Sequence, residues 1–192
     1  MDKINQFEWN RQLFHIFLGI AIVALLLYDF IDKKIILIII ITGVILSYLS
    51  KTIRVPIIYD LLQKFERKED IERFSGKGII FYFIGAYATL LLFPKDIAMA
   101  SIMVLALGDS VSHLYGLHYG KIKHPFSKTK FIEGTIAGII FGFIGAFVFL
   151  PWWEALLASF AAMIVQAIEI KIGTQQVDDN FIVPFVAGAA VW

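Results

Sequence analysis

The chain has 192 residues, of which 59% are hydrophobic and 17% are charged, and its mean hydropathy is +0.78. These values lie outside the range of soluble globular domains. They predict an all-α fold, a polytopic transmembrane helical bundle that forms a single domain over residues 1–192. The chain has no cysteine, which excludes disulfides, thiolate metal sites and cysteine nucleophiles.

Apolar runs predict about seven membrane helices in chain order. We expect spans over 12–29, 34–50, 78–94, 96–118, 131–150, 152–171 and 181–192. The last run is short, about 18 Å as a helix, so it crosses a bilayer only with help. The polar N-terminal residues carry no cleavage signal, so the first span is expected to stay as an anchor. Residues 57–74 favour a short helix on the membrane surface, with a solvated loop over 66–73 as the alternative.

The basic residues predict the orientation of this bundle. The expected spans place Lys33, Lys34 and Lys95 on one side of the membrane and the other fourteen of the 17 Lys and Arg on the opposite side. By the positive-inside rule, the N-terminus and the loops around 51–77, 119–130 and 172–180 are then cytoplasmic.

Asp109 lies inside the apolar run 96–118 and is the most informative residue of the chain. A carboxylate in this position costs roughly 2.5–3.5 kcal/mol on insertion scales, so it needs a partner or a chemical role. Ser112, His113 and Gly116 are expected on the same helical face. A polar clamp between helices, without catalysis, is the alternative interpretation.

Other polar residues gather at the predicted cytoplasmic end of the spans. They are Glu8, Arg11 and His15 in the first span region, Glu133 at the start of the fifth, Gln166 and Glu169 at the end of the sixth, and Asp178, Asp179 and Asn180 beyond it. Acids beside basic residues suit a polyanion bound with a divalent ion, because Mg²⁺ takes carboxylate and phosphate oxygens and Lys or Arg neutralises the remaining charge. The basic run from Lys121 to Lys130 could also be only a topology signal.

Two groups of glycines receive different interpretations. Gly76, Gly78, Gly108, Gly116 and Gly120 lie at the cytoplasmic end, where backbone N–H groups could approach a phosphate closely. Gly134, Gly138 and Gly142 recur at every fourth residue, which predicts close helix packing. No P-loop, protein-kinase motif, dinucleotide fingerprint or HExxH motif occurs, so nucleotide chemistry would need another architecture.

Taken in order, five short motifs resemble the membrane CTP-dependent lipid kinases, a group that comprises dolichol kinase, CTP-using diacylglycerol kinase and phytol kinase and is similar to phosphatidate cytidylyltransferases. The motifs are Glu8-x-x-Arg11-x-x-x-His15-x-x-x-Gly19, Gly76-Lys77-Gly78, Gly108-Asp109 with Gly116 and Gly120, Lys128-Thr129-x-x-x-Glu133-Gly134-Thr135, and Asp179-Asn180-x-x-x-Pro184. The chain departs from these motifs at two places. Gln12 follows Arg11 where the family usually has Lys, and the small residue three positions after the central Asp is here Ser112, followed by His113.

The resemblance implies that the γ-phosphate of CTP is transferred to a lipid alcohol with Mg²⁺, at the cytoplasmic face. Asp109, Glu133 and Asp179 are then the metal-ligand or base candidates, Arg11 stabilises developing charge, and His15 orients carboxylates. The nucleotide contacts would come from Gly76, Lys77, Gly78, Gly108, Gly116, Gly120, Lys128, Thr129, Lys130 and Asn180. The expected partners are CTP, the bilayer and a lipid alcohol, with dolichol or another polyprenol favoured, no nucleic acid, and a homo-oligomer possible.

Three other functions fit the same residues. A phosphatidate cytidylyltransferase would use the same acids and metal to attack the α-phosphate. An ion-coupled transporter would place Asp109 in its ion path, but its polar residues should continue to both membrane faces. A non-catalytic scaffold requires that Asp109→Asn leave lipid phosphorylation unchanged.

Overall fold

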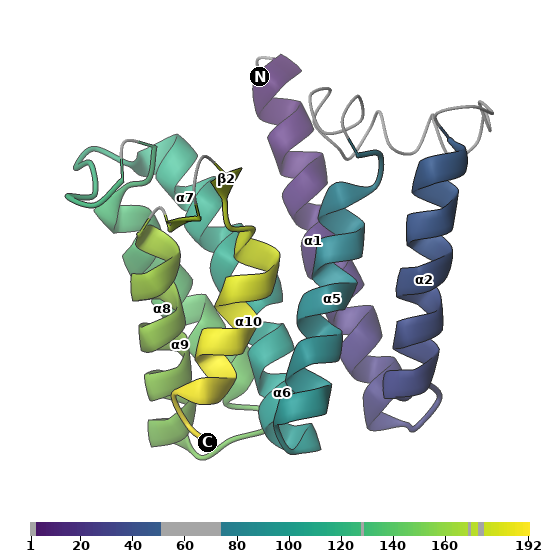
Figure 1. Cartoon of the computed structure of the whole chain (residues 1–192). Coiled ribbons are helices and arrows are strands. Elements are labelled where there is room, and N and C mark those ends of the chain that lie inside the picture. The colour runs from purple at the N-terminus through teal and green to yellow at the C-terminus, as the bar shows by residue number, and fades with distance from the viewer. Residues whose placement is uncertain (1–2, 51–73, 128, 169, 173–174) are drawn as a thin grey trace.

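The computed structural model describes residues 3–50, 74–127, 129–168, 170–172 and 175–192. In this part of the chain, helices run up and down beside one another (Figure 1). They are α1 (Lys3–Leu27), α2 (Lys33–Leu49), α5 (Lys77–Leu92), α6 (Lys95–Met103), η1 (Val104–Asp109), α7 (Ser110–Tyr119), α8 (Ile132–Ala146), α9 (Trp152–Ala167) and α10 (Asp179–Ala189). Two short strands, β1 (Lys171–Ile172) and β2 (Gln175–Gln176), pair antiparallel between α9 and α10.

Each of the seven predicted spans coincides with a helix, but several ends differ from the prediction. The first helix begins at Lys3 rather than at 12, because its polar N-terminal residues continue the helix. The fifth span ends at Ala146, where the chain turns, and the sixth ends at Ala167, ahead of the β1–β2 hairpin. The surface helix predicted over 57–74 lies, apart from Phe74, outside the described residues.

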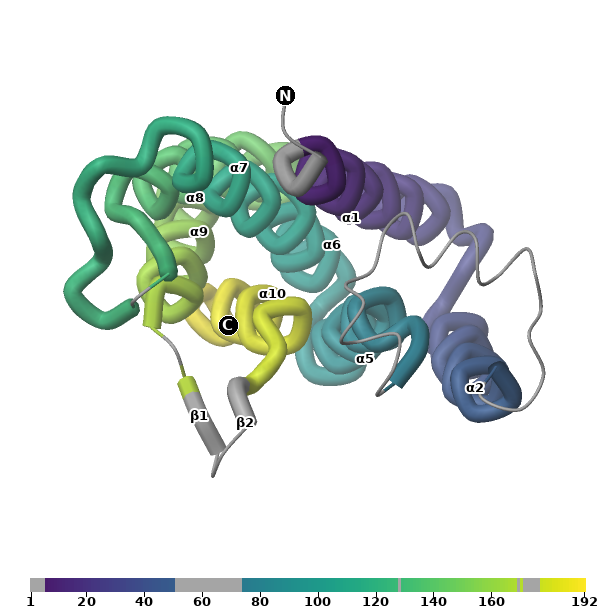
Figure 2. Tube along the Cα trace, turned by 90° about the horizontal axis from the view of Figure 1, so that it is seen from above, coloured from purple at the N-terminus to yellow at the C-terminus, as the bar shows by residue number. Residues whose placement is uncertain are grey.

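The helix with Asp109 is the central one. α6, η1 and α7 form one continuous helix, Lys95–Tyr119, which packs against α1, α5, α8, α9 and α10 (Figure 2). Its middle turn, η1, is a π-helix, a wide turn that is rare and often occurs at functional sites. The span expected over 96–118 is therefore helical throughout, and the last residue of its π-turn is Asp109.

Small residues allow the helices to approach closely around η1. A Cβ added to Gly138 would lie 2.7 Å from the Met163 Sδ and 2.8 Å from the Gly108 carbonyl oxygen. A Cβ on Gly142 would lie 2.5 Å from the Ser159 Oγ. The close packing predicted for Gly134, Gly138 and Gly142 is thus confirmed, because all three are buried in this interface.

The outer surface of the bundle is apolar. On α8 the small residues face inward, whereas Ile136, Ile140 and Ile144 are each more than half exposed. By length and composition, the helical stretches Gln6–Leu27 and Lys95–Tyr119 could cross a bilayer, and α5, α8 and α9 are apolar but shorter. These features support membrane association, while a crossing by all seven helices stays a prediction.

The up-and-down course brings seven helix ends together at the upper end of Figure 1. These are the N-terminal ends of α1, α5, α8 and α10 and the C-terminal ends of α2, α7 and α9. We call this the polar end, because it carries Glu8, Arg11, Lys77, Lys130 and Asp178.

Candidate active site

Asp109 is the residue around which the polar end is organised. Its Oδ1 accepts a hydrogen bond of 2.9 Å from the Nε2 of Gln166 on α9, and no hydrogen bond reaches its Oδ2 from the part of the chain that the structure describes. The Asp109 charge acts on His15 of α1 and on Asp178 and Asp179 at the start of α10. Groups from three other helices therefore interact with this carboxylate.

The first helix contributes an acid, a guanidinium group and an imidazole ring. The Glu8 carboxylate pairs with Arg11 at 2.8 Å and with the Nε2 of His113 on α7 at 3.1 Å, and its side chain is only 12% exposed. The ring of His15 meets the ring of Tyr82 edge-on, with 5.4 Å between centroids. His113 contacts Glu8 on α1, whereas Asp109 contacts Gln166 on α9. The two residues, predicted to lie on one helical face, therefore have partners on different helices.

The start of α10 is tied to the loop after α7 and to the end of α9. Lys130 Nζ lies 2.9 Å from the Asp179 Oδ2 and also donates to the backbone carbonyl of Gln166. That carbonyl belongs to the last turn of α9, where helix carbonyls lack intrahelical partners and attract cations. Lys130 therefore joins the two helices that flank Asp109.

Asp178 caps α10 and connects it to α5. Its side chain accepts from the Asn180 backbone N–H at 3.1 Å, and the Lys77 Nζ lies 3.6 Å from its Oδ2. The Asn180 Nδ2 in turn donates to the Gly78 carbonyl at 3.4 Å. The two motifs Gly76-Lys77-Gly78 and Asp179-Asn180 thus form one contact region.

Burial changes the proton affinity of the two acids at the start of α10. Burial, followed by the negative charge of Asp109, raises the pKa of Asp179 to about 6 despite the neighbouring Lys130. Burial also raises the pKa of Asp178. A carboxylate with a pKa near 6 suits proton transfer at neutral pH, because it is deprotonated there and yet basic enough to accept a proton.

Glu133 lies in the first turn of α8, the predicted position. Its carboxylate accepts from the backbone N–H groups of Lys121 and Ile122, each at 3.1 Å, and so fixes the loop that follows α7. Within the described ranges, no three His, Asp or Glu side chains lie close enough to hold a metal ion. The Asp109 charge therefore reaches Asp179, whereas Glu133 contacts the loop after α7.

The predicted glycines divide into turn residues and packing residues. Gly76 has a φ of 82°, the left-handed conformation that glycine adopts without strain, and it begins α5. Gly108 and Gly116 face α8, where added Cβ atoms would lie 3.1 Å from the Gly138 oxygen and 3.6 Å from the Gly134 Cα. Helix packing therefore accounts for these two glycines.

The remaining predicted residues lie in or near the loop after α7. Gly120 ends α7, and a Cβ there would overlap the Phe131 ring. The Thr129 backbone N–H donates to the Ser127 Oγ at 3.1 Å. Lys128 lies outside the described residues.

Three buried polar side chains received no role from the sequence, although Gln166 belongs to the polar group predicted at this end. Gln166 binds Asp109 through its amide nitrogen, while its Oε1 is buried without a partner; the Gln12 Oε1 and the hydroxyl of the fully buried Tyr82 are likewise unpartnered among the described residues. Buried polar atoms are usually paired, so such a group marks a place where water or a ligand fits. Glutamines within apolar helices were a visible signal; Tyr82 gave none.

Comparisons with known proteins identify relatives. The chain is 31% identical over 184 residues to an uncharacterized protein of Methanocaldococcus jannaschii, covering 93% of this chain and 90% of that protein. It is 24% identical over 138 residues to CTP-dependent diacylglycerol kinase 1 of Schizosaccharomyces pombe, covering 63% of this chain and 62% of that protein. It is 28% identical over 130 residues to the chloroplastic phytol kinase 1 of Arabidopsis thaliana, covering 60% of this chain and 43% of the plant protein. No family model and no solved structure matches.

Proposed function

The chain belongs to the CTP-dependent lipid kinase family, and we propose that it transfers the γ-phosphate of CTP to the hydroxyl of a membrane lipid alcohol. A bond forms between the lipid oxygen and the γ-phosphorus, and the bond from that phosphorus to the β,γ-bridging oxygen breaks. CDP leaves, and the hydroxyl proton passes to a carboxylate.

The single observation that carries this proposal is the convergence on Asp109. One buried helix turn, the start of α10 and the first helix bring acids and bases together at one end of a bundle whose outer surface is apolar. Phosphoryl transfer needs little covalent chemistry from the protein, so positioning and electrostatic stabilisation dominate its catalysis. The polar end has the charges for both tasks.

Asp109 is the residue that would hold Mg²⁺. Mg²⁺ is bound by one or two carboxylates together with phosphate oxygens, and Asp109 has an oxygen without a hydrogen bond in the described structure. When bound, the ion would neutralise charge on the phosphates. Asp179, with its pKa raised to about 6, is our candidate for accepting the hydroxyl proton.

Three cations at the polar end of the described structure each pair with an acid and could bind the triphosphate. Arg11 pairs with Glu8, Lys130 with Asp179 and Lys77 with Asp178. Phosphate oxygens form strong charge-assisted hydrogen bonds with such groups. We propose that CTP enters from the cytoplasm and exchanges these ion pairs for its own contacts, in a multi-pass protein whose N-terminus is also cytoplasmic.

The acceptor is proposed as a lipid because the bundle is apolar outside. The names of the relatives specify diacylglycerol in one case and phytol in another. Dolichol or another polyprenol is the acceptor that we favoured from the sequence. These three alcohols share a hydroxyl on a long apolar chain, which places the reaction at the membrane surface.

Labelled CTP tests the proposal directly. Purified protein with Mg²⁺ and γ-labelled CTP should label at least one of dolichol, diacylglycerol and phytol, and Asp109→Ala should reduce this labelling about 10³-fold. Asp96→Ala, on the exposed start of the same central helix, is the matched control and should retain activity. Transfer of a cytosine label into lipid would instead identify a cytidylyltransferase and overturn the kinase proposal.

A further inference from the structure

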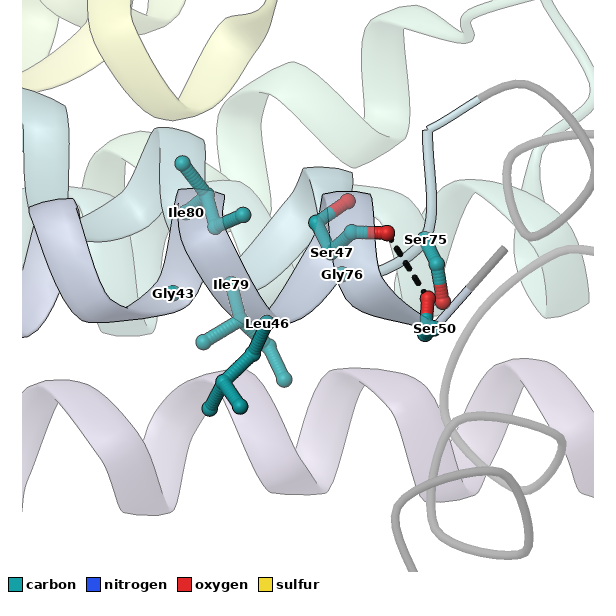
Figure 3. A pocket seen from close by; sticks show the side chains of 8 residues that line it. All are labelled: Gly43, Leu46, Ser47, Ser50, Ser75, Gly76, Ile79 and Ile80. Carbon is teal, nitrogen blue, oxygen red and sulfur yellow. Dashed lines mark hydrogen bonds between the residues drawn. The ribbon is translucent and has the colours of Figure 1, made fainter. Parts of the chain in front are cut away.

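The helices meet in different ways at the polar end. Between α2 and α5 lies a hollow of about 150 Å³ with mostly apolar walls, along which Leu46, Ile79 and Ile80 lie (Figure 3). The first helix, α1, instead runs beside α7 (Figure 2), and polar side chains join these two helices. A polar contact, unlike an apolar one, can hold a charged group in a fixed direction, and Arg11 lies on the turn of α1 that makes this contact.

Two histidines of α7 contact α1, and each has a defined hydrogen-bonding role. The Trp9 Nε1 donates to the His118 Nε2 at 3.1 Å. Because an indole N–H only donates, His118 accepts there and carries its proton on Nδ1, which donates to the Leu114 carbonyl at 2.9 Å. The His113 Nε2 donates to the Glu8 Oε2 at 3.1 Å, since an ionised carboxylate only accepts. The two histidines thus hold consecutive residues of α1.

Arg11 is in turn held by Glu8. The Glu8 Oε2 accepts from the Arg11 Nε at 3.0 Å and from the Arg11 Nη2 at 2.8 Å. A guanidinium group is planar and carries five N–H donors in a rigid fork, so binding one edge sets the direction of the remaining donors. The charges of Glu8 and Arg11 both act on His15, as does that of Asp109. The oriented guanidinium therefore belongs to the same electrostatic cluster as the proposed metal-binding carboxylate.

Part of the Arg11 guanidinium is available to a ligand. From the part of the chain that the structure describes, no hydrogen-bond acceptor reaches its Nη1. An ammonium group is a point charge, whereas a guanidinium can bind a carboxylate with one edge and a phosphate with another. Arg11 can therefore bind phosphate without leaving Glu8, so the exchange of ion pairs proposed above is partial at this residue.

We propose that Glu8 and His113 are positioning residues for the binding of CTP. Glu8 keeps its bonds to the Arg11 Nε and Nη2 while the remaining N–H groups of the guanidinium bind the triphosphate, and His113 keeps Glu8 in that orientation. The inference rests on the proposed function, because it explains how one of its phosphate-binding cations is directed. It gives a role to two residues that otherwise take no part in the chemistry.

A double-mutant cycle between Glu8 and Arg11 tests the first step. Calorimetry on the purified protein, without lipid, measures the dissociation constant of CTP with Mg²⁺. Glu8→Gln keeps the size of the side chain but removes its charge, and it should weaken CTP binding about tenfold. In an Arg11→Gln background the same change should weaken binding less than about twofold, because Glu8 acts through Arg11. Tighter binding by Glu8→Gln would show that the acid competes with phosphate, and equal losses in both backgrounds would show that it acts elsewhere; either result overturns the inference.

Two replacements of His113 test the second step. His113→Gln retains an N–H donor for Glu8, whereas His113→Leu removes it. We expect His113→Leu to weaken CTP binding about fivefold and His113→Gln to stay within about twofold of wild type. Tyr115→Leu, at a position of the same helix that is 43% exposed, is the control and should leave CTP binding unchanged. Equal losses in His113→Gln and His113→Leu would show that donation to Glu8 is not what His113 contributes.

The same measurements separate this inference from the proposed kinase activity, because CTP binding is followed without a lipid acceptor. If the wild-type protein phosphorylates a lipid alcohol but Glu8→Gln binds CTP as tightly as wild type, the positioning role fails and the kinase proposal stands. If the cycle gives the expected values while no lipid is phosphorylated, the kinase proposal fails and the positioning role stands.

Discussion

The two ends of the bundle use charged residues in different ways. At the polar end, Glu8 and Asp178 are only 12% and 16% exposed, and their cationic partners come from the same or another helix. At the opposite end, Asp29 is 85% exposed and pairs with Lys95, while Asp32 caps α2 through two backbone N–H groups. Exposed charges there shape turns, whereas half-buried charges at the polar end alter one another's proton affinity.

This difference indicates where chemistry is possible. A buried carboxylate costs free energy that an exposed one does not. Several buried carboxylates close together therefore have shifted pKa values, and such groups cluster at functional sites. The raised pKa of Asp179 follows from burial and from the charge of Asp109. Variants that remove single charges test whether the two ends differ in this way.

The largest effect is expected from Asp179. Asp179→Asn removes the proposed base but retains the size of the side chain and its position at the start of α10. We expect the rate of lipid phosphorylation to fall about 10³-fold. Asp29→Asn, at the opposite end, should change it less than about twofold. Equal rates for the two variants would contradict the assignment of the active end.

The pH dependence of the reaction should reveal the same group. Since only deprotonated Asp179 can accept a proton, kcat/KM should rise with pH through about 6, the pKa that burial and Asp109 give it. The folded state holds its proton more tightly than the unfolded state, whose pKa is near 3.8, so this group should make folding stability fall as pH rises from about 4 to about 6. Asp179→Asn should remove the stability change, which unfolding followed at several pH values would show.

Gln166 should have an intermediate effect. Gln166→Leu retains a similar volume but removes the amide that holds the Asp109 Oδ1. We expect a loss of roughly tenfold in kcat and a higher Mg²⁺ concentration at half-maximal rate, since a hydrogen bond that orients a metal-binding carboxylate has about this effect. Ser159→Ala, on the same helix, removes a bond to the Ile139 carbonyl and should change stability alone. An unchanged Mg²⁺ dependence in Gln166→Leu would show that the amide does not position Asp109.

The helices were readable from the sequence because apolar length and glycine spacing specify them locally. The seven runs and the packing glycines of α8 each correspond to a feature of the structure. The start of α1 and the end of α9 could not be predicted from the sequence. Polar residues can continue a helix, and strands of two residues such as β1 and β2 have no distinct pattern. The π-turn before Asp109 also lacks a sequence mark, because it depends on how η1 packs against four neighbouring helices.

For the site, the sequence predicted which residue types gather but not which atoms meet. Lys130 was expected near phosphate, and the structure adds its contacts with Asp179 and the last turn of α9. Glu133 looked like a third metal ligand because it begins a helix near the other acids. Its actual partners are backbone N–H groups, and such contacts depend on the path of a loop that residue spacing does not define.

The smallest effects belong to the opposite end, where the ion pair and the backbone can be separated. Asp29 has a φ of 57°, a conformation that Asn also tolerates but Ala does not, and its carboxylate lies 2.6 Å from the Lys95 Nζ. Asp29→Asn should therefore remove only the exposed ion pair and lower the free energy of unfolding by about 0–1 kcal/mol. Asp29→Ala should cost about 1–2 kcal/mol more, because the left-handed turn becomes strained. Thermal unfolding of both variants and of the wild type in one detergent measures the two effects. Full lipid phosphorylation by each would show that stability and chemistry reside at different ends of the molecule, whereas a loss of activity in Asp29→Asn would show that the ends are coupled.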